Sequence, residues 1–150
     1  MFTPSREQVR QFFCNIWHKH HAQLSLTPLE NLAWKWIIVH PEYHALLADK
    51  SAALTRDFNI ESHQTNPFLH LAMHLSISEQ ITIDQPPGIR HLSIALIQKL
   101  DSEHEAHHYV MECLGETLWN SQRYHTPLDS TAYLACIEQQ LSRLGRSSSN

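Results

Sequence analysis

Helix-start signals recur along this sequence, and each is followed by apolar residues at helical spacing. The first pairs Ser5 with Gln8 as a capping box, in which each side chain satisfies a backbone N–H of the same first turn. Similar cap residues precede three later apolar segments: Thr27, Asn66 and Ser102. The chain has only three glycines, which disfavours loop-rich and barrel architectures. These features predict an all-α protein.

The apolar periodicity predicts a bundle of about five to six helices with a four-helix core. The expected long helices cover residues 5–23, 27–40, 66–83, 89–100, 103–123 and 129–144. Pro41 disfavours helical geometry at His40, so we expect a break there, with Pro41 beginning a short helix through Ala48. One or two further turns over residues 51–58 and a polar loop over residues 59–65 should follow. We predict a single domain over residues 1–144 and a disordered C-terminal tail over residues 145–150.

Charge and cysteine usage narrow the functional classes. The net charge of −4 and the lack of a basic run make binding to nucleic acid by counterion release improbable. No apolar stretch approaches the roughly 18 residues of a membrane span, and the N-terminus does not have the pattern of a signal peptide. The three cysteines are far apart and never in CxxC spacing, which predicts reduced, buried thiols without a disulfide framework. We therefore expect a cytoplasmic protein.

Histidines are the residues of this chain that most strongly suggest a chemical function. Thirteen are present, and six of them form pairs at i, i+4 spacing. The pairs are His40/His44, His70/His74 and His104/His108. This spacing places two imidazoles one turn apart on the same side of a helix. Because chance alone predicts about one such pair at this histidine content, the setting of each pair decides its meaning.

His70 and His74 lie on a predicted helix that is apolar on both sides, so we expect this pair to be buried. A neutral buried imidazole needs a partner for each ring nitrogen. A metal ion on one nitrogen and a carbonyl or carboxylate on the other would satisfy both. A pair of hydrogen-bonded core histidines remains the alternative.

His104, His108 and Glu112 follow one another at i+4 steps on the fifth long helix. We expect them to continue an apolar face that consists of Met111, Leu114, Leu118 and Trp119. His107 points away from that line and is expected at the surface. An ordinary capped helix is the alternative, because acidic residues are common in a first turn.

His40 and His44 flank Pro41, so the spacing does not determine their relative direction. A histidine at such a break in the helix can be a metal ligand. The sequence is equally compatible with histidines that take no part in metal binding. Glu30 and Glu79 are carboxylates on neighbouring long helices, and we expect both to be solvated.

Together these patterns predict a helical core that binds one or two transition-metal ions. The predicted ligands are His70, His74, His104 and His108, with His40, His44 and Glu112 as further candidates. Nitrogen-rich sites suit zinc, iron, nickel or copper better than magnesium or calcium, and we expect zinc or iron. A catalytic site would use a metal-bound water or an iron redox centre.

The same sequence allows two alternatives without catalysis. One is a helical interaction or scaffold protein with structural histidines, and the other is a metal sensor or store. The pattern determines neither enzymatic activity nor a small-molecule substrate. We expect no nucleic acid or membrane partner, and a homodimer is compatible with the sequence.

Several segments resemble one known family. They are HPEYH at 40–44, QTNPFLH at 64–70, QPPGI at 85–89, HEAHH at 104–108 and MECLGE at 111–116. These segments resemble a proteobacterial family of uncharacterised proteins, domain of unknown function 1841, and the likeness runs from about Phe2 to Tyr133. The resemblance implies a bacterial cytosolic protein without an assigned activity. The family's sequence blocks coincide with the three histidine pairs, whereas the position of His107 is variable in its pattern.

Overall fold

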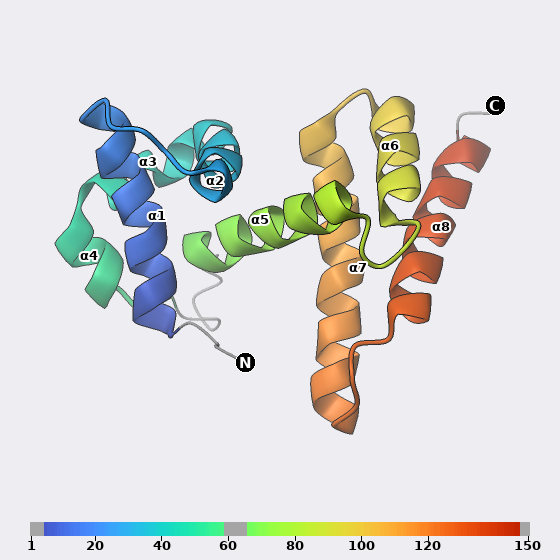
Figure 1. Cartoon of the computed structure of the whole chain (residues 1–150). Coiled ribbons are helices and arrows are strands. Elements are labelled where there is room, and N and C mark those ends of the chain that lie inside the picture. The colour runs from blue at the N-terminus through green and yellow to red at the C-terminus, as the bar shows by residue number, and fades with distance from the viewer. Residues whose placement is uncertain (1–4, 59–65, 148–150) are drawn as a thin grey trace. The chain divides into compact units, whose positions relative to one another are not determined.

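The computed structural model describes residues 5–58 and 66–147, and these residues form eight α-helices, one short 3-10 helix and no strand (Figure 1). The all-α class is therefore confirmed, whereas the predicted number of five to six helices is too low. The chain divides into two compact units, Met1–Leu75 and Ser76–Asn150, which we call the N-terminal and C-terminal units. Their boundary falls within the continuous helix α5 (Pro67–Ile83). The single domain over residues 1–144 stays a prediction.

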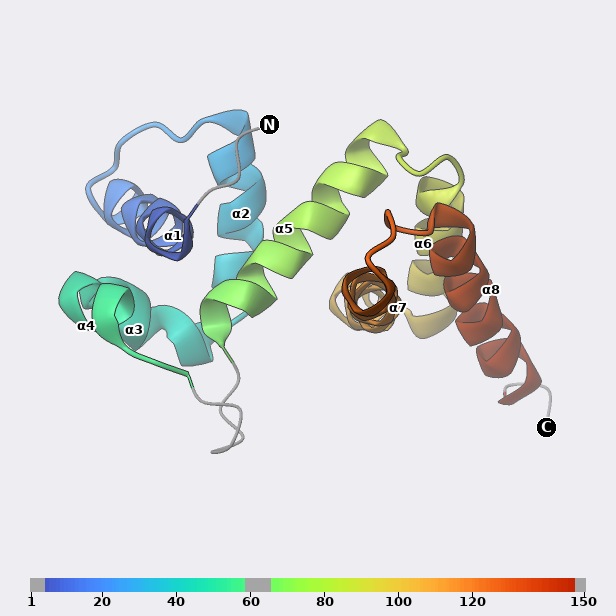
Figure 2. The ribbon, with the colours of Figure 1, turned by 90° about the horizontal axis from the view of Figure 1, so that it is seen from below.

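The N-terminal unit contains four helices before α5: α1 (Arg6–His21), α2 (Pro28–Ile38), α3 (His44–Ala48) and α4 (Lys50–Thr55). Helix α1 contacts α2, α3 and α4 (Figures 1 and 2). The capping boxes predicted at Ser5 and Thr27 are both present. The core of this unit includes Phe13, Ile16, Trp36, Ile37, Leu47, Phe68, Leu71 and Leu75.

The expected break at Pro41 explains the larger number of helices. Helix α2 ends at Ile38, and His40 adopts a non-helical backbone with φ −124° and ψ 65°. Pro41 then begins a short 3-10 helix that leads directly into α3. Asp49 separates α3 from α4 and accepts a hydrogen bond from the backbone N–H of Ala52. The short helix predicted from Pro41 through Ala48 is thus present as the 3-10 helix and α3, and the further turns predicted over residues 51–58 correspond to α4.

The C-terminal unit begins with the second half of α5 and adds three helices: α6 (Ile89–Leu100), α7 (Glu103–Tyr124) and α8 (Ser130–Ser147). Helices α6, α7 and α8 lie side by side (Figures 1 and 2). The buried Tyr133 donates its hydroxyl proton to Gln80 Oε1 at 2.7 Å, which attaches α8 to α5. Helix α8 extends to Ser147, into the predicted tail, while residues 148–150 and the predicted loop 59–65 lie outside the described residues.

A disulfide joins Cys113 on α7 to Cys136 on α8, and their Cα atoms lie 5.7 Å apart. The prediction of reduced thiols was therefore wrong for this pair. The two cysteines are 23 positions apart, and only the packing of α7 against α8 brings them together. The cysteines no longer support a cytoplasmic location. Cys14 is free and buried, and burial raises the pKa of its thiol.

Helix α7 buries a face that shares only Leu114 with the predicted one. Its buried residues are Ala106, His107, Val110, Cys113, Leu114 and Thr117. Leu118 and Trp119, which were expected to face the core, are 40% and 55% exposed. The buried face is built mainly from small and β-branched side chains, which permit close helix packing, whereas the prediction followed the largest apolar residues. The expectation that His107 lies at the surface is wrong for the same reason.

A helix that crosses a membrane must be both long and apolar. Within residues 5–58 and 66–147, none of the helices combines the length and the apolar character that crossing a bilayer requires.

Candidate metal centre

His40 is positioned by the end of α2. Its Nδ1 lies 2.7 Å from the carbonyl oxygen of Trp36, one turn earlier, and the side chain is buried. A carbonyl oxygen only accepts hydrogen bonds, so Nδ1 carries the proton and donates it. The neutral ring therefore presents the lone pair of Nε2, which is the tautomer that a metal-ligating histidine needs. Tyr43 stacks on the imidazole, with ring centroids 5.3 Å apart.

Helix α5 positions the other two imidazoles. Asn66 caps this helix by accepting hydrogen bonds from the backbone N–H groups of Phe68 and Leu69 at 3.0 and 3.3 Å. His70 and His74 then lie one turn apart, as predicted. His74 is completely buried, and its ring stacks on the indole of Trp36 at 4.2 Å between centroids and 12° between planes. This stack holds the plane of the His74 ring.

The three imidazoles converge through their Nε2 atoms. His70 Nε2 lies 3.1 Å from His40 Nε2 and 3.2 Å from His74 Nε2. Ring nitrogens of His40 and His74 are within 4.8 Å of one another. We call these residues the histidine cluster of the N-terminal unit. It unites the predicted pair on α5 with one member of the pair that flanks Pro41.

The two shortest of these separations fit a common metal ion. In a tetrahedral site with metal–nitrogen bonds of about 2.0–2.1 Å, neighbouring ligand nitrogens lie about 3.3 Å apart. The observed separations of 3.1 and 3.2 Å are close to that value. A proton on His70 Nε2 is the alternative, and it would be shared between two acceptors in a bent geometry that weakens hydrogen bonds. The donor set therefore suits a metal that prefers imidazole nitrogen.

His44 points to a different partner. Its Nε2 donates to the carbonyl oxygen of Ile37 at 2.7 Å, and its ring lies against Trp17 at 4.8 Å between centroids. The structure thus separates the two histidines of this pair and brings only His40 to the cluster through its Nε2 atom. A ligand role of His44 stays a prediction.

His104 and His108 lie next to one another on α7 in the C-terminal unit. Their ring centroids are 4.5 Å apart with 63° between the planes. His104 is half-buried, whereas His108 and Glu112 are exposed. The expected core-facing line is therefore not present at this end of α7, because the buried face runs through Ala106 and Val110. The roles of these three residues as ligands stay predictions.

Glu30 is buried, which corrects the expectation that it is solvated. One carboxylate oxygen accepts the backbone N–H of Thr27 at 2.9 Å, and the other pairs with Lys19 Nζ at 2.9 Å. The hydrogen bond from Thr27 and then the one from Lys19 hold the pKa of this carboxyl below its ordinary value. Both oxygens are engaged in holding α2, so Glu30 is a structural residue here. Glu79 is exposed, as predicted.

Sequence reasoning missed the aromatic residues that orient the cluster. Trp36 supplies the carbonyl for His40 and the stacking surface for His74. The available signal was its position four residues before His40, because helical backbone carbonyls accept hydrogen bonds from groups one turn ahead. The stack on His74 spans 38 positions and follows from tertiary packing alone.

The comparisons with known proteins give a family and nothing beyond it. The family model described as "Domain of unknown function (DUF1841)" matches residues 5–139. No match was found among curated proteins or among solved structures.

Proposed function

The chain belongs to the DUF1841 family, and we propose that it binds a transition-metal ion through the histidine cluster of the N-terminal unit. The observation that carries this proposal is the convergence of three Nε2 atoms, with successive separations of 3.1 and 3.2 Å. Three imidazole nitrogens favour zinc or iron over the hard cations magnesium and calcium. Binding of one or two ions was the expectation from the sequence.

The surrounding residues support such a role. The carbonyl of Trp36 keeps the His40 proton on Nδ1, and the indole of Trp36 restrains His74. A three-nitrogen donor set leaves a coordination position for water or substrate, as in catalytic zinc sites. A metal ion bound there would supply Lewis acidity and lower the pKa of a coordinated water. The proposal assigns binding and leaves the reaction open.

His104, His108 and Glu112 are proposed as further ligands on the basis of their i+4 spacing. Their contribution is tested separately by a variant that replaces both histidines with alanine. We expect this variant to retain less metal than the wild-type protein after dialysis.

The primary experiment is elemental analysis of untagged protein purified without a chelator. We expect about one ion per chain, and a content below about a tenth would contradict the proposal. His70→Ala removes the central nitrogen of the cluster and should abolish the bound metal. His91→Ala is the matched control, because His91 is an exposed histidine on α6. Equal metal in wild-type and His70→Ala protein would show that other residues are the ligands.

Thermal unfolding separates metal binding from a purely structural use of the histidines. A bound metal stabilises the folded state, so chelation should lower the Tm of the wild-type protein. The same treatment should leave the Tm of His70→Ala unchanged. A metal-free wild-type protein whose Tm does not respond to added zinc or iron would favour the scaffold alternative.

A further inference from the structure

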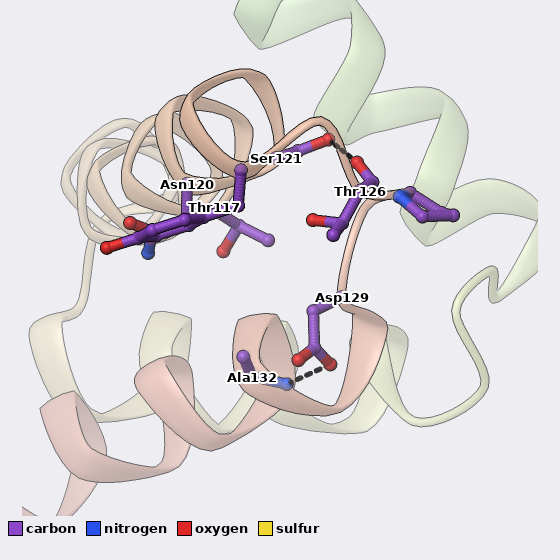
Figure 3. Close-up of a pocket in the computed structure, with 8 residues that line it drawn as sticks. Thr117, Asn120, Ser121, Thr126, Asp129 and Ala132 are labelled. Atoms are coloured by element: carbon purple, nitrogen blue, oxygen red, sulfur yellow. Dashed lines mark hydrogen bonds between the residues drawn. The ribbon is translucent and has the colours of Figure 1, made fainter.

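A cavity of about 300 Å³ lies in the C-terminal unit, where the chain turns from the end of α7 into the start of α8 (Figure 3). Its walls come from the last turns of α7, the connecting loop and the first turn of α8. Such a volume corresponds to roughly ten water molecules at liquid density and is at the lower end of the range for small-molecule sites. The cavity therefore has room for one small organic molecule.

Local bonds hold the walls of this cavity in place. The Ser121 hydroxyl donates to the carbonyl oxygen of Thr126, which fixes the loop against the end of α7. One oxygen of the Asp129 carboxylate accepts the backbone N–H of Ala132 at 3.0 Å, which fixes the first turn of α8. The disulfide joins the same two helices. A site that is formed before the ligand arrives loses less conformational entropy when it binds.

Other polar groups at the cavity are available to a ligand. The Asn120 amide and the hydroxyls of Tyr124 and Thr126 make no hydrogen bond within the part of the chain that the structure describes, and the second carboxylate oxygen of Asp129 is likewise unengaged. All four residues are exposed, so a ligand can reach them. Figure 3 shows Asn120 and Thr126 on one side of the cavity, with Asp129 and Ala132 on the other. A bound molecule would contact both sides.

The kinds of polar group at the cavity match a ligand with several hydroxyls. A carboxylate oxygen accepts hydrogen bonds, an amide both donates and accepts, and a hydroxyl does either. Each hydroxyl of a sugar also donates and accepts, so adjacent hydroxyls can satisfy Asp129 and Asn120 together. The ring of Tyr124 and the side chain of Pro127 add apolar surface for the carbon-bound hydrogens of a sugar ring.

Charged ligands match these walls less well. Among the described residues that line the cavity, Asp129 is the charged one, and none is a lysine, arginine or histidine. A phosphate or a carboxylate ligand would therefore meet a like charge without a compensating cation. Calcium takes six to eight oxygen ligands, whereas one oxygen of the only lining carboxylate is already bonded to Ala132. A neutral molecule avoids both costs.

We propose that this cavity binds a single neutral sugar or a related cyclic polyol. The unengaged oxygen of Asp129 accepts hydrogen bonds from hydroxyls of the ligand, the amide of Asn120 bonds to two adjacent hydroxyls, and the sugar ring lies against Tyr124. These hydrogen bonds replace others to water, so we expect a dissociation constant of about 1 mM. The site does not depend on the proposed metal centre.

The first test is NMR of the ¹⁵N-labelled full chain, titrated with glucose, galactose, mannose and myo-inositol. At least one of these compounds should shift the side-chain amide resonances of Asn120 and the backbone resonance of Ala132, and both shifts should saturate. Cyclohexanol, which has a ring of similar size and a single hydroxyl, should leave them in place. The absence of a saturating response to all the polyols, or an equal response to cyclohexanol, would overturn the proposal. A response to calcium chloride or inorganic phosphate alone would replace the polyol assignment with an ion site.

Variants decide whether the binding takes place in this cavity. Asp129→Asn keeps a helix-capping side chain but loses the carboxylate, and Asn120→Leu loses the amide, so each should weaken binding about tenfold. Ala132→Leu fills the cavity without removing a polar side chain and should abolish binding. Ala135→Leu is the matched control, because Ala135 is exposed on the same helix and does not line the cavity. If a polar variant does not fold, unchanged binding by Ala132→Leu would still contradict the proposal.

Discussion

The N-terminal unit buries a guanidinium and two imidazoles in its interior, whereas the C-terminal unit joins α7 to α8 by a disulfide. The core of the C-terminal unit consists mainly of aliphatic side chains, among them Ile77, Ile89, Leu96, Val110 and Ile137. Its buried histidine, His107, lies on α7 beside these residues. The two units are both helical, but they place different chemistry in their cores.

This difference indicates that the N-terminal unit is the better place to look for a functional site in the interior. Burying polar and charged groups lowers stability unless they find partners, so an unsatisfied buried group is informative. The N-terminal unit buries such an unsatisfied group at Arg10, and it also buries the paired imidazoles of His40 and His74. The exposed or half-buried histidines of α7 carry a smaller desolvation cost and are less informative. The main proposal therefore concentrates on the N-terminal unit.

The largest expected effect is the loss of the disulfide. Cys136→Ser opens a link between residues 23 positions apart, which should lower the free energy of unfolding by about 3 kcal/mol. Urea unfolding with and without a phosphine reductant measures it. The reductant should destabilise the wild type but leave Cys136→Ser unchanged, and metal content should stay the same in both. A wild type that is insensitive to the reductant would remove the contrast between the units.

The second-largest effect is expected when the two histidines that flank Pro41 are replaced one at a time. His40→Ala should weaken metal binding by about a hundredfold or more, because it removes an oriented ligand. His44→Ala should change the affinity by less than about threefold, since its Nε2 donates to Ile37. Competition with a chromophoric chelator measures both. Equal losses in the two variants would mean that the whole pair binds the metal, as the spacing alone predicted.

The third effect concerns Tyr133 in the C-terminal unit. Tyr133→Phe removes the hydrogen bond to Gln80 and should cost about 1 kcal/mol of stability at neutral pH. Burial raises the pKa of Tyr133 above its ordinary value of 10.0, so the folded state disfavours the tyrosinate. The corresponding stability is complete below that ordinary value and is lost as the pH rises above it. Urea unfolding as a function of pH should show a smaller alkaline loss for Tyr133→Phe than for the wild type.

The smallest effect concerns Glu30 in the N-terminal unit. Glu30→Gln keeps an acceptor for the cap but loses the ion pair with Lys19, at a cost of about 0.5 kcal/mol. Because the pKa of Glu30 is lowered in the folded state, its contribution is present above the ordinary value of 4.5 and is lost as the pH falls. Thermal unfolding at pH 7 and in acid should show the difference shrinking. Glu79→Gln, at an exposed carboxylate of α5, should show no such difference.

Local features of the chain were predictable from the sequence. The caps at Ser5, Thr27 and Asn66 and the break before Pro41 all appear where the residue types indicate them. These features depend on hydrogen bonds and backbone sterics within about four residues. The pairing of His70 with His74 on one helix side belongs to the same class.

The candidate sites were only partly predictable. The sequence indicated His70 and His74, but it did not show that His40, and not His44, would join them through Nε2. It gave no indication that Arg10 would be buried, because a basic residue near an apolar stripe is usually solvated through a flexible side chain. The partner of Cys113 was likewise not predictable, because it lies 23 positions further along the chain.

The sequence by itself determined that this chain is helical, where most of its helices begin, and which histidines share a helix side. Only the tertiary structure decided which face of α7 is buried, which cysteines meet, and which imidazoles and guanidinium lie inside the N-terminal unit. The physical reason is the range of the forces involved. Caps and turns are settled by neighbours in the chain, whereas burial is settled by close packing between helices that the sequence places far apart.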